Sequence, residues 1–426
     1  MSIGFLSCAT APPAPAPREG FPLDPREGLS GPFDASIEKG WRALVSGDTE
    51  RAGREFRLAA ERPSGTSRRA GAIGAIESLV LAGRAEEAAA PCERELSEGE
   101  PTLPLWTACA EALAKNGDTN AAYELYQRAA DRSPQRRGIA RRAEQLRASA
   151  TDALLSAAER DASEGKRAEA RAKVIQALVW SPREAAVLAR AAQVECASGE
   201  KEDALRHYRD ALSLGGVDEE VEERAGELAL ETGDFAMAVM VFDSLAARNP
   251  ALRERAAEAR LAFRIDNWPE AERQAAHARR LTRAGGALLT SWMFPELFEG
   301  RVRSGVVASD VLERKDSRVM VRAVALGLLD VDPETHRARP DASLSRAAAA
   351  QLLLRLAALI GKAGSETSCS SAAGEAPRTG GEAIRLAARC GLLSESGGAF
   401  VGGPEMTRGL DRLRSEFDLR EASQRD

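Results

Sequence analysis

The feature that most constrains the fold is a motif that recurs at a fixed spacing through the first two thirds of the chain. Each copy has a Gly, an Ala five residues later, often an aromatic residue four after that, and then a second Ala. The clearest copy comprises Trp106, Gly117, Asp118, Ala122, Tyr126, Ala129 and Pro134. Thirty-four residues separate Gly165 from Gly199, and again Gly199 from Gly233. A fixed period of this length predicts stacked helical hairpins rather than one globular catalytic core.

Each position of the motif has a physical reason. The Gly allows a sharp turn between two antiparallel helices. The first Ala is expected where the second helix crosses the first too closely for a larger side chain. The aromatic residue and the second Ala follow it at i+4 and i+7, so that all three share one helix face. The Pro ends the hairpin, because the residue before a proline disfavours helix. One hairpin cannot bury this face alone, so its neighbours must cover it.

The pattern resembles the tetratricopeptide repeat (TPR) family over residues 34–280. Further copies are centred on Gly47, Gly83, Gly165, Gly199 and Gly233, and a degenerate last unit keeps Trp268, Ala271 and Ala278. The resemblance implies an all-α solenoid of six to seven hairpins. The step from Gly117 to Gly165 is 48 residues, 14 more than one period of 34. The excess falls in the Arg-rich segment 135–150, so we expect a lengthened helix there and a solenoid that bends or splits.

In the TPR family, peptides bind the concave face lined by the first helix of each hairpin. By this resemblance, the groove candidates are Glu111, Asp152, Glu159, Glu220, Glu223, Arg224 and Glu227. These residues predict an acidic groove that prefers basic or polar ligands from a protein or peptide partner. The alternative is that the same acids only keep the surface soluble. The Lys and Asn set that grips C-terminal carboxylates in chaperone-binding relatives is absent, so we do not expect chaperone tails as ligands.

The C-terminal third lacks the repeat motif and has a different sequence pattern. Residues 323–329 predict a helix ending at a Gly, Arg339-Pro340-Asp341 marks a loop, and Ser345 is placed to cap the next helix. A second, shorter copy of this pattern runs through 387–393 and then Met406-Thr407-Arg408. This resembles the S-layer-homology family, well over 305–360 and less well over 380–416. The acidic residue of the family motif is missing from both copies, so the resemblance over residues 301–426 is to a degenerate member of that family.

The S-layer-homology resemblance implies binding to peptidoglycan or a cell-wall polymer, with Arg346 and Arg408 at an anionic glycan site. The alternative is that each Arg only opens a helix beside its capping hydroxyl and that the domain is structural. Residues 281–300 lie between the two regions and hold a dense apolar cluster. We expect this junction to be the seam where the last hairpin packs on the C-terminal domain; the alternative is a patch for a partner.

Residues 1–33 are rich in Pro and Ala and predict an extended, disordered linker. Phe5-Leu6-Ser7-Cys8 resembles the end of a bacterial lipoprotein signal, in which Cys8 would be acylated. Too few apolar residues precede Cys8 for a complete signal, which suggests a truncated one whose start codon was assigned too late. The open alternative is a cytosolic tail with an incidental Cys. The two hypotheses predict a periplasmic or outer-membrane lipoprotein and a cytoplasmic protein, respectively.

The remaining residues argue against other functions. No stretch approaches 18 uninterrupted apolar residues, so no membrane span is expected. The formal net charge of −6 argues against a general nucleic-acid binder. No catalytic motif, cofactor-binding motif or zinc-ligand spacing occurs, so we expect no enzyme, no cofactor and no metal. Cys92, Cys109 and Cys196 are predicted to be small core residues, whereas pairing of Cys369 with Cys390 stays open.

Overall fold

The computed structural model describes residues 20–299, 308–362 and 377–423. Within these ranges the chain is all-α: it has helices and no strand, with two isolated backbone bridges, Thr282 to Ser343 and Ser345 to Phe400. The chain divides into two compact units, residues 1–228 and 229–426, and each is treated by itself. The division falls inside a helix of the repeat region, and not at residue 280 where the composition changes.

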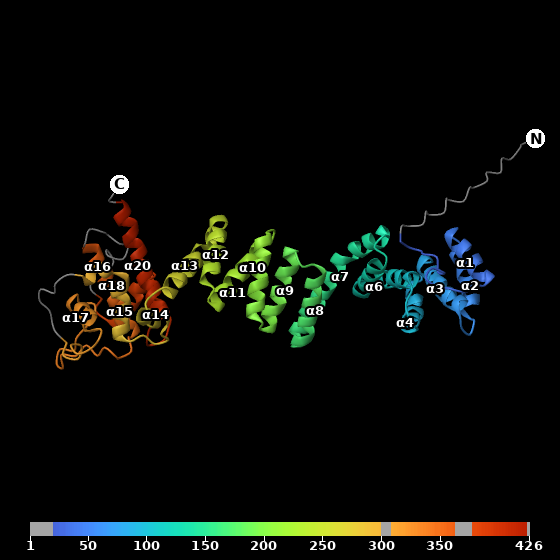
Figure 1. The fold of residues 1–426 in the computed structure, drawn as a ribbon. Helices are drawn as coiled ribbons and strands as arrows, with labels where there is room; N and C mark the ends of the chain where they lie inside the picture. The colour runs from blue at the N-terminus through green and yellow to red at the C-terminus, as the bar shows by residue number, and fades with distance from the viewer. Residues whose placement is uncertain (1–19, 300–307, 363–376, 424–426) are drawn as a thin grey trace, which may run out of the picture. The chain divides into compact units, whose positions relative to one another are not determined.

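The first unit is a row of antiparallel helical hairpins, drawn from blue to green in Figure 1. Its helices are α1 (Ala35–Val45), α2 (Thr49–Ala60), α3 (Thr66–Leu81), α4 (Ala89–Ser97) preceded by a 3₁₀ turn (Ala85–Ala88), α5 (Leu103–Lys115), α6 (Thr119–Arg132), α7 (Arg137–Ser163), α8 (Arg167–Trp180), α9 (Ala185–Ser198), α10 (Lys201–Leu214) and α11 (Glu219–Thr232). We call α1, α3, α5, α7, α9 and α11 the first helices, because each opens a hairpin.

The structure confirms the repeat motif position by position. The six turn glycines all have φ between +77° and +86°, a left-handed conformation that other residues rarely adopt: Gly47, Gly83, Gly117, Gly165, Gly199 and Gly233. The alanines five residues later are all fully buried: Ala52, Ala88, Ala122, Ala170, Ala204 and Ala238. Asp48 and Asp118 each cap the second helix of a hairpin by accepting a backbone N–H from the third residue on, at 3.0 and 3.1 Å. The register therefore follows from the sequence alone.

The predicted lengthened helix is α7, which runs for 27 residues where its neighbours α5 and α9 have 13 and 14. The Arg-rich segment forms the added turns at its N-terminal end. Its polar residues are not all solvated, since Arg136 contacts Glu27 at 2.7 Å and Arg142 contacts Glu111 at 3.1 Å. The added turns of α7 thus give the first unit a surface that a hairpin of ordinary length lacks.

Close helix packing makes one helical glycine indispensable. A Cβ on Gly71 of α3 would lie 2.6 Å from the backbone N of Ala60 and 2.7 Å from the carbonyl oxygen of Phe56. In an open helix, Gly→Ala stabilises by about 1 kcal/mol. We expect Gly71→Ala to destabilise instead, by about 1–3 kcal/mol, because backbone must move. The control is Gly53→Ala in α2, whose Cβ would meet only Ser78 at 3.6 Å. Thermal unfolding followed by circular dichroism compares the two, and equal stabilisation by both would contradict the packing.

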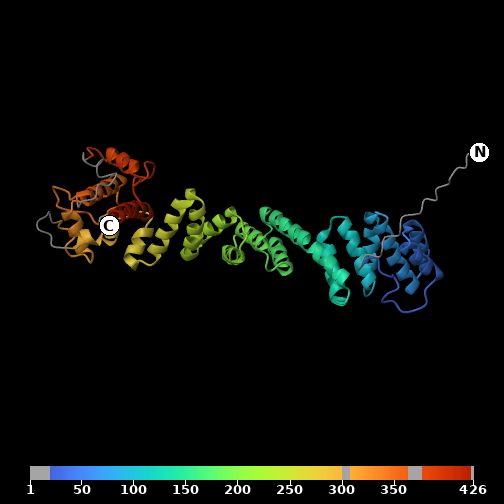
Figure 2. The same ribbon diagram turned by 90° about the horizontal axis from the view of Figure 1, so that it is seen from above.

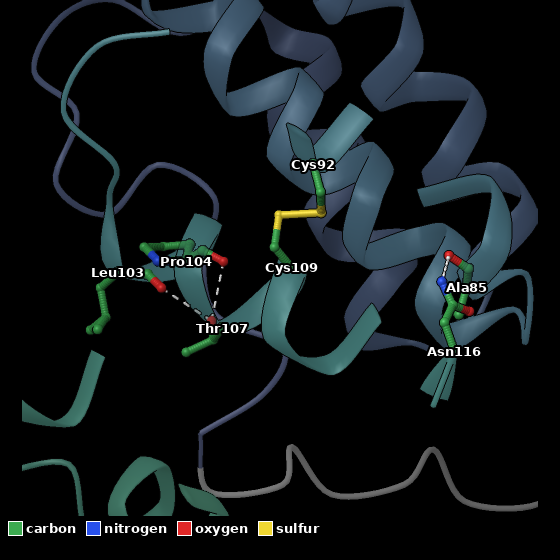
Figure 3. The surroundings of a disulfide bond; sticks show 7 residues. All are labelled: Ala85, Cys92, Leu103, Pro104, Thr107, Cys109 and Asn116. Atoms are coloured by element: carbon green, nitrogen blue, oxygen red, sulfur yellow. Dashed lines mark hydrogen bonds between the residues drawn. A yellow bond between two sulfur atoms is a disulfide. The ribbon is translucent and has the colours of Figure 1, made fainter. Parts of the chain in front are cut away.

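Repeat two replaces the usual motif residues with a different set of contacts. Cys92 stands where other copies have an aromatic residue, and it is bonded to Cys109, which links α4 to α5 (Figure 3). Glu95 stands where the second Ala is expected, and its buried carboxylate meets Arg68 of α3 at 2.9 Å. The prediction that Cys92 and Cys109 are only small core residues is wrong: both are buried, but they form a disulfide. Cys196 takes no part in this bond. Cys390 is disulfide-bonded, and Cys369, the partner considered for it, lies outside the described residues.

Residues 20–33 differ from the predicted linker. Phe21 and Leu23 are buried among the apolar side chains of repeats two and three, and the chain then continues directly into α1. Leu29 and Phe33 pack on a second cluster beside α1 and α2. We call residues 20–31 the strap. Cys8 and the rest of residues 1–19 lie outside the described residues.

The second unit contains α12 (Phe235–Arg248), α13 (Arg253–Asp266), α14 (Glu270–His277), α15 (Arg283–Met293), α16 (Pro295–Phe298), α17 (Ser317–Ala325), α18 (Arg346–Lys362), α19 (Gly380–Arg389) and α20 (Gly403–Ser423), with a 3₁₀ turn at Pro250–Leu252 before α13. Figure 2 shows α17 to α20, in orange and red, gathered into one cluster. One apolar core joins these helices to α13, α14 and α15. The predicted glycine stops are present, since Gly327 and Gly391 have φ of +70° and +66°.

Three segments of the second unit are tied into a ring by backbone hydrogen bonds. Leu281 N donates to Val401 O at 2.9 Å, Leu344 N to Leu281 O at 2.7 Å, and Val401 N to Leu344 O at 3.1 Å. Each of these residues lies just before a helix, α15, α18 or α20. The domain therefore contains a cyclic set of three loop–helix modules, one more than the two copies that the sequence revealed.

Two boundaries predicted at the end of the repeats need correction. Residues 281–299 belong to the C-terminal core, because Phe294 is fully buried in it and α15 opens the first of the three modules. The same core includes residues of α13 and α14, so the apolar cluster packs with the last hairpin inside this unit. In the degenerate repeat, Ala271 is exposed and Ala276 is buried instead, so the phase assigned to that unit is wrong.

Candidate functional site

The predicted groove acids are largely paired with arginines. Asp152 and Glu159 of α7 both contact Arg190 of the next first helix, α9, and the Glu159 contact measures 2.8 Å. Glu220 of α11 contacts Arg224 at 2.5 Å on the same helix. Glu223 is half-buried on α11, and Glu227 is exposed. Because these acids are neutralised by neighbouring arginines, the surface is less acidic than the residue types suggest. A preference for basic ligands stays a prediction.

Glu111 is held by other residues of the chain. It is buried on α5, accepts a hydrogen bond from the Tyr126 hydroxyl at 2.8 Å, and forms a two-pronged contact with Arg142 of α7 at 3.1 Å to each oxygen. Burial and the Glu111 carboxylate together raise the pKa of Tyr126 far above its ordinary value. This network fixes α5, α6 and α7 against one another and engages both oxygens of the carboxylate.

The strap lies across the first helices of repeats two, three and four. Gly20 approaches the backbone of Gly138 in α7 so closely that a Cβ would lie 3.1 Å away, and Glu27 contacts Arg136 just before α7. A Cβ on Gly28 would lie 3.5 Å from Thr102 at the start of α5. At its end, Thr66 at the start of α3 donates to the carbonyl of Pro32 at 3.0 Å. The strap thus contacts α7, α5 and α3, and Leu23 meets α3 between the contacts that Gly20 and Glu27 make at α7.

Beneath the strap, Glu77 of α3 is a buried acid with an unusual environment. Its Oε1 accepts the backbone N–H of Leu23 at 3.0 Å, and among the described residues its Oε2 has no hydrogen-bond partner. Burial raises the pKa of Glu77 well above its ordinary value; the Leu23 N–H opposes this, and the nearby Asp24 charge adds to it. A protonated carboxyl is therefore the form that this site favours.

The raised pKa predicts a pH dependence of stability. The unfolded chain releases the Glu77 proton near pH 4.5, whereas the folded chain keeps it to higher pH. Below that pH, Glu77 does not lower the free energy of unfolding. As pH rises toward the pKa of the folded state, the free energy of unfolding falls by about 1.4 kcal/mol per pH unit. We expect Glu77→Gln to match the wild type in stability near pH 4.5 and to exceed it increasingly as pH rises from there. Thermal unfolding across this range measures the difference, and a constant offset between the two proteins would contradict the assignment.

The side chain of Arg346 is bound by other residues of the chain. Its guanidinium is buried and meets both oxygens of Glu405, at 2.6 and 2.8 Å. It also donates to the carbonyls of Gly398 and Ser394, at 3.0 and 2.8 Å. These contacts hold the loop between α19 and α20 in place. To bind an anionic sugar, Arg346 would have to leave Glu405, so the glycan role predicted for it has no support from these contacts.

Arg408 lies in the second turn of α20, exposed, and not at a helix start. The register predicted for its module is wrong, because α20 begins at Gly403, and the buried Thr407 hydroxyl donates to the Gly403 carbonyl at 2.8 Å inside the helix. Arg408 makes no ion pair among the described residues. It lines a cavity of about 710 Å³ between α13 and α20, together with Arg346, Arg412, Glu254, Glu258, Glu405 and Asp411. The structure thus brings the two predicted arginines to one cavity of mixed charge.

Sequence reasoning missed Arg283, which the ring of modules shows to be the counterpart of Arg346. Arg283 opens α15 and donates to the carbonyls of Ala338 and Asp330, in the loop of the next module. Asp330 and Ser394 each follow a turn glycine, Gly327 and Gly391, by three residues. Arg283 and Arg346 therefore both hold a loop of their domain by donating to its backbone carbonyls. The string Thr282-Arg283-Ala284 was the signal for this role in the sequence.

Comparison with known proteins gives only distant likenesses. No family model matches the chain, and no curated protein matches its sequence. Among solved structures, a thermophilic TPR protein from Thermus thermophilus matches at 23% identity and a TM-score of 0.21, covering 45% of this chain and 97% of that one. The Pseudomonas aeruginosa protein pilF matches at 17% identity and a TM-score of 0.24, covering 55% and 97%. The TPR2AB domain of yeast Sti1, in its complex with pHSP90, matches at 13% identity and 0.23, covering 54% and 95%.

At such TM-scores these likenesses decide nothing about function. The description of the chain as an all-α, TPR-like solenoid rests on its own hairpins, turn glycines and buried alanines. In the parts of the chain that the structure describes, no helix is both long and apolar enough to cross a membrane. Within the same ranges, no three His, Cys, Asp or Glu side chains are gathered as metal ligands would be.

Proposed function

We propose that this chain is a non-catalytic scaffold that holds an extended segment of a partner protein on its first helices. The observation that carries the proposal is the row of hairpins in the first unit, where successive first helices present side chains that are paired from helix to helix. Arg142 joins α7 to α5, and Arg190 joins α9 to α7. Such a row offers a continuous, ordered surface for a chain segment.

We further propose that the protein works in an oxidising compartment of the bacterial cell envelope. The Cys92–Cys109 disulfide supports this, because disulfides persist in exported proteins and are rare in the cytosol. Blocking free thiols in intact cells before lysis, followed by mass spectrometry, tests it. The proposal requires Cys92 and Cys109 to be recovered as a disulfide; recovery of both as blocked thiols would contradict it. Labelling with a palmitate analogue, with Cys8→Ser as the control, tests the lipid anchor.

We propose anchoring as the role of the C-terminal domain, with Arg408 as the contact to an anionic cell-wall polymer. Its support is the exposed guanidinium, without an ion pair among the described residues, at a cavity large enough for sugar units. Sedimentation with purified peptidoglycan measures this. Arg408→Ala should lose binding while Arg318→Ala, a substitution on α17, keeps it. Equal sedimentation of both variants and the wild type would contradict the assignment.

A second candidate function is a cytosolic adaptor whose C-terminal domain is only a cap. One observation favours it: α13 and α14, the last hairpin, share a single apolar core with α15, α18 and α20. A solenoid needs such a cover at its end, because its last hairpin has an apolar face with no further repeat against it. Cell fractionation separates the candidates, since the adaptor belongs in the cytosolic fraction and the scaffold in the envelope fraction.

A further inference from the structure

The strap contacts the first unit as a bound peptide would. Its backbone is not helical, and two apolar side chains, Phe21 and Leu23, are nine-tenths or more buried among the side chains of repeats two and three. Both pack in the core cluster that includes Ile73 and Ile76 of α3. The surface beneath the strap is thus shaped for two apolar side chains at this spacing.

Polar contacts fix the direction and register of the strap. The Leu23 N–H donates to buried Glu77, so the backbone itself is recognised between the two apolar side chains. Four residues further on, Glu27 meets Arg136 with 2.7 Å to each of its oxygens. A buried carboxyl acceptor and an arginine at a set distance specify a non-helical segment in which an apolar pair is followed, within a turn at residues 25–28, by an acidic residue.

The same surface continues past the described end of the strap. A cavity of about 340 Å³ adjoins Gly20 and Phe21 and is lined by Glu111, Tyr126, Gly138, Arg141, Arg142 and Gln145. These residues come from α5, α6 and α7. The face therefore has hydrogen-bonding side chains next to the apolar site, as a peptide site requires.

We propose that the strap-covered face of α3, α5 and α7 is a peptide-binding surface, and that the strap competes there with a partner. The partner is a non-helical segment with two apolar side chains two residues apart, followed within a turn by an acidic residue. This rests on the proposed scaffold function and deepens it by naming the ligand class. Displacing the strap exposes Glu77 and the apolar cluster, and the partner segment restores both sets of contacts.

The test is a titration of the full chain with a fluorescent peptide of residues 18–31. In the wild type the strap occupies the face, so we expect weak binding. In the full-length Phe21→Ser/Leu23→Ser variant the strap is loosened and the face is unchanged, so we expect a Kd at least tenfold lower. A peptide with the same two substitutions is the control and should not bind. Equal affinity of the wild type and the variant for the unmodified peptide would overturn the proposal.

A charge exchange sharpens the test. Glu27→Arg places like charges together at Arg136 and should also lower the peptide Kd relative to the wild type, if the peptide keeps its own Glu. Adding Arg136→Glu lets the strap close again with the reversed pair, and should raise the Kd for the unmodified peptide above that of the single variant. If the double variant binds this peptide as tightly as the single one, the strap does not compete through this contact.

A measurement on the unmodified protein covers the case in which a variant unfolds. Hydrogen exchange should show the Leu23 amide opening at least tenfold faster than the amides of α3, because the strap leaves while the hairpins remain. Equal rates would mean that the strap opens only with the whole unit, which would overturn the proposal. This test needs no cellular partner, so its failure is distinct from a failure to find one.

Discussion

Replacing Arg346 with Ala is expected to destabilise the second unit by about 3 kcal/mol. The substitution removes the partner of Glu405 and the donor to the carbonyls of Gly398 and Ser394, in a site where Arg346 is almost fully buried. Chemical denaturation of the full chain measures the loss. Arg346→Lys keeps the charge but not the forked geometry, so an intermediate loss is expected.

The matched control for Arg346 is Arg408→Ala. Both arginines line the same cavity, but Arg408 is exposed and makes no ion pair among the described residues. Its removal should change stability by no more than about 0.5 kcal/mol. If the two variants were equally stable and Arg346→Ala lost only glycan binding, the stabilising role assigned to the Arg346 contacts would be wrong.

Removing the Cys92–Cys109 bond is expected to destabilise the first unit by about 3 kcal/mol. The bond closes a loop between residues 17 apart in sequence, and constraining such a loop in the unfolded chain has this effect. The double substitution to Ser leaves two buried hydroxyls, so the double substitution to Ala is the cleaner variant. Unfolding of oxidised wild type, reduced wild type and the Ala variant provides the measurement.

The expected order is that reduced wild type and the Ala variant both unfold at lower denaturant than the oxidised protein. Cys196→Ala serves as the control, because Cys196 lies on α9 outside the Cys92–Cys109 bond and its replacement leaves that bond intact. Coincident unfolding of oxidised and reduced wild type would show that repeat two does not depend on the bond.

The hairpins could be predicted because local chemistry fixes them. Gly117 must turn left-handed and Ala122 must fit a close helix crossing, and these demands recur in every repeat. The disulfide could not be predicted, because Cys92 and Cys109 fall at buried repeat positions where a small apolar residue serves equally well. Only the approach of α4 to α5 brings the two sulfur atoms together.

The strap and the third module were missed for related reasons. Pro22 and Pro25 indicate an extended chain, and sequence does not say whether such a chain is free or packed. In the third module, Gly403 stands where Arg346 stands in the second. A side chain there would overlap the carbonyl oxygens of Ala275 and Ala276, so packing removed the residue that identifies the motif. The motif-like string Thr407-Arg408 lies inside α20 and not at its start.

The most direct test of the scaffold function is photo-crosslinking in cells from two adjacent helices of the first unit. A photoreactive amino acid at Asp152 reports on the row of first helices, and one at Ile175 of α8 reports on a second helix; both positions are exposed. The account predicts a discrete protein adduct from position 152 that is absent from position 175. The same adducts from both positions, or adducts from position 175 alone, would contradict it.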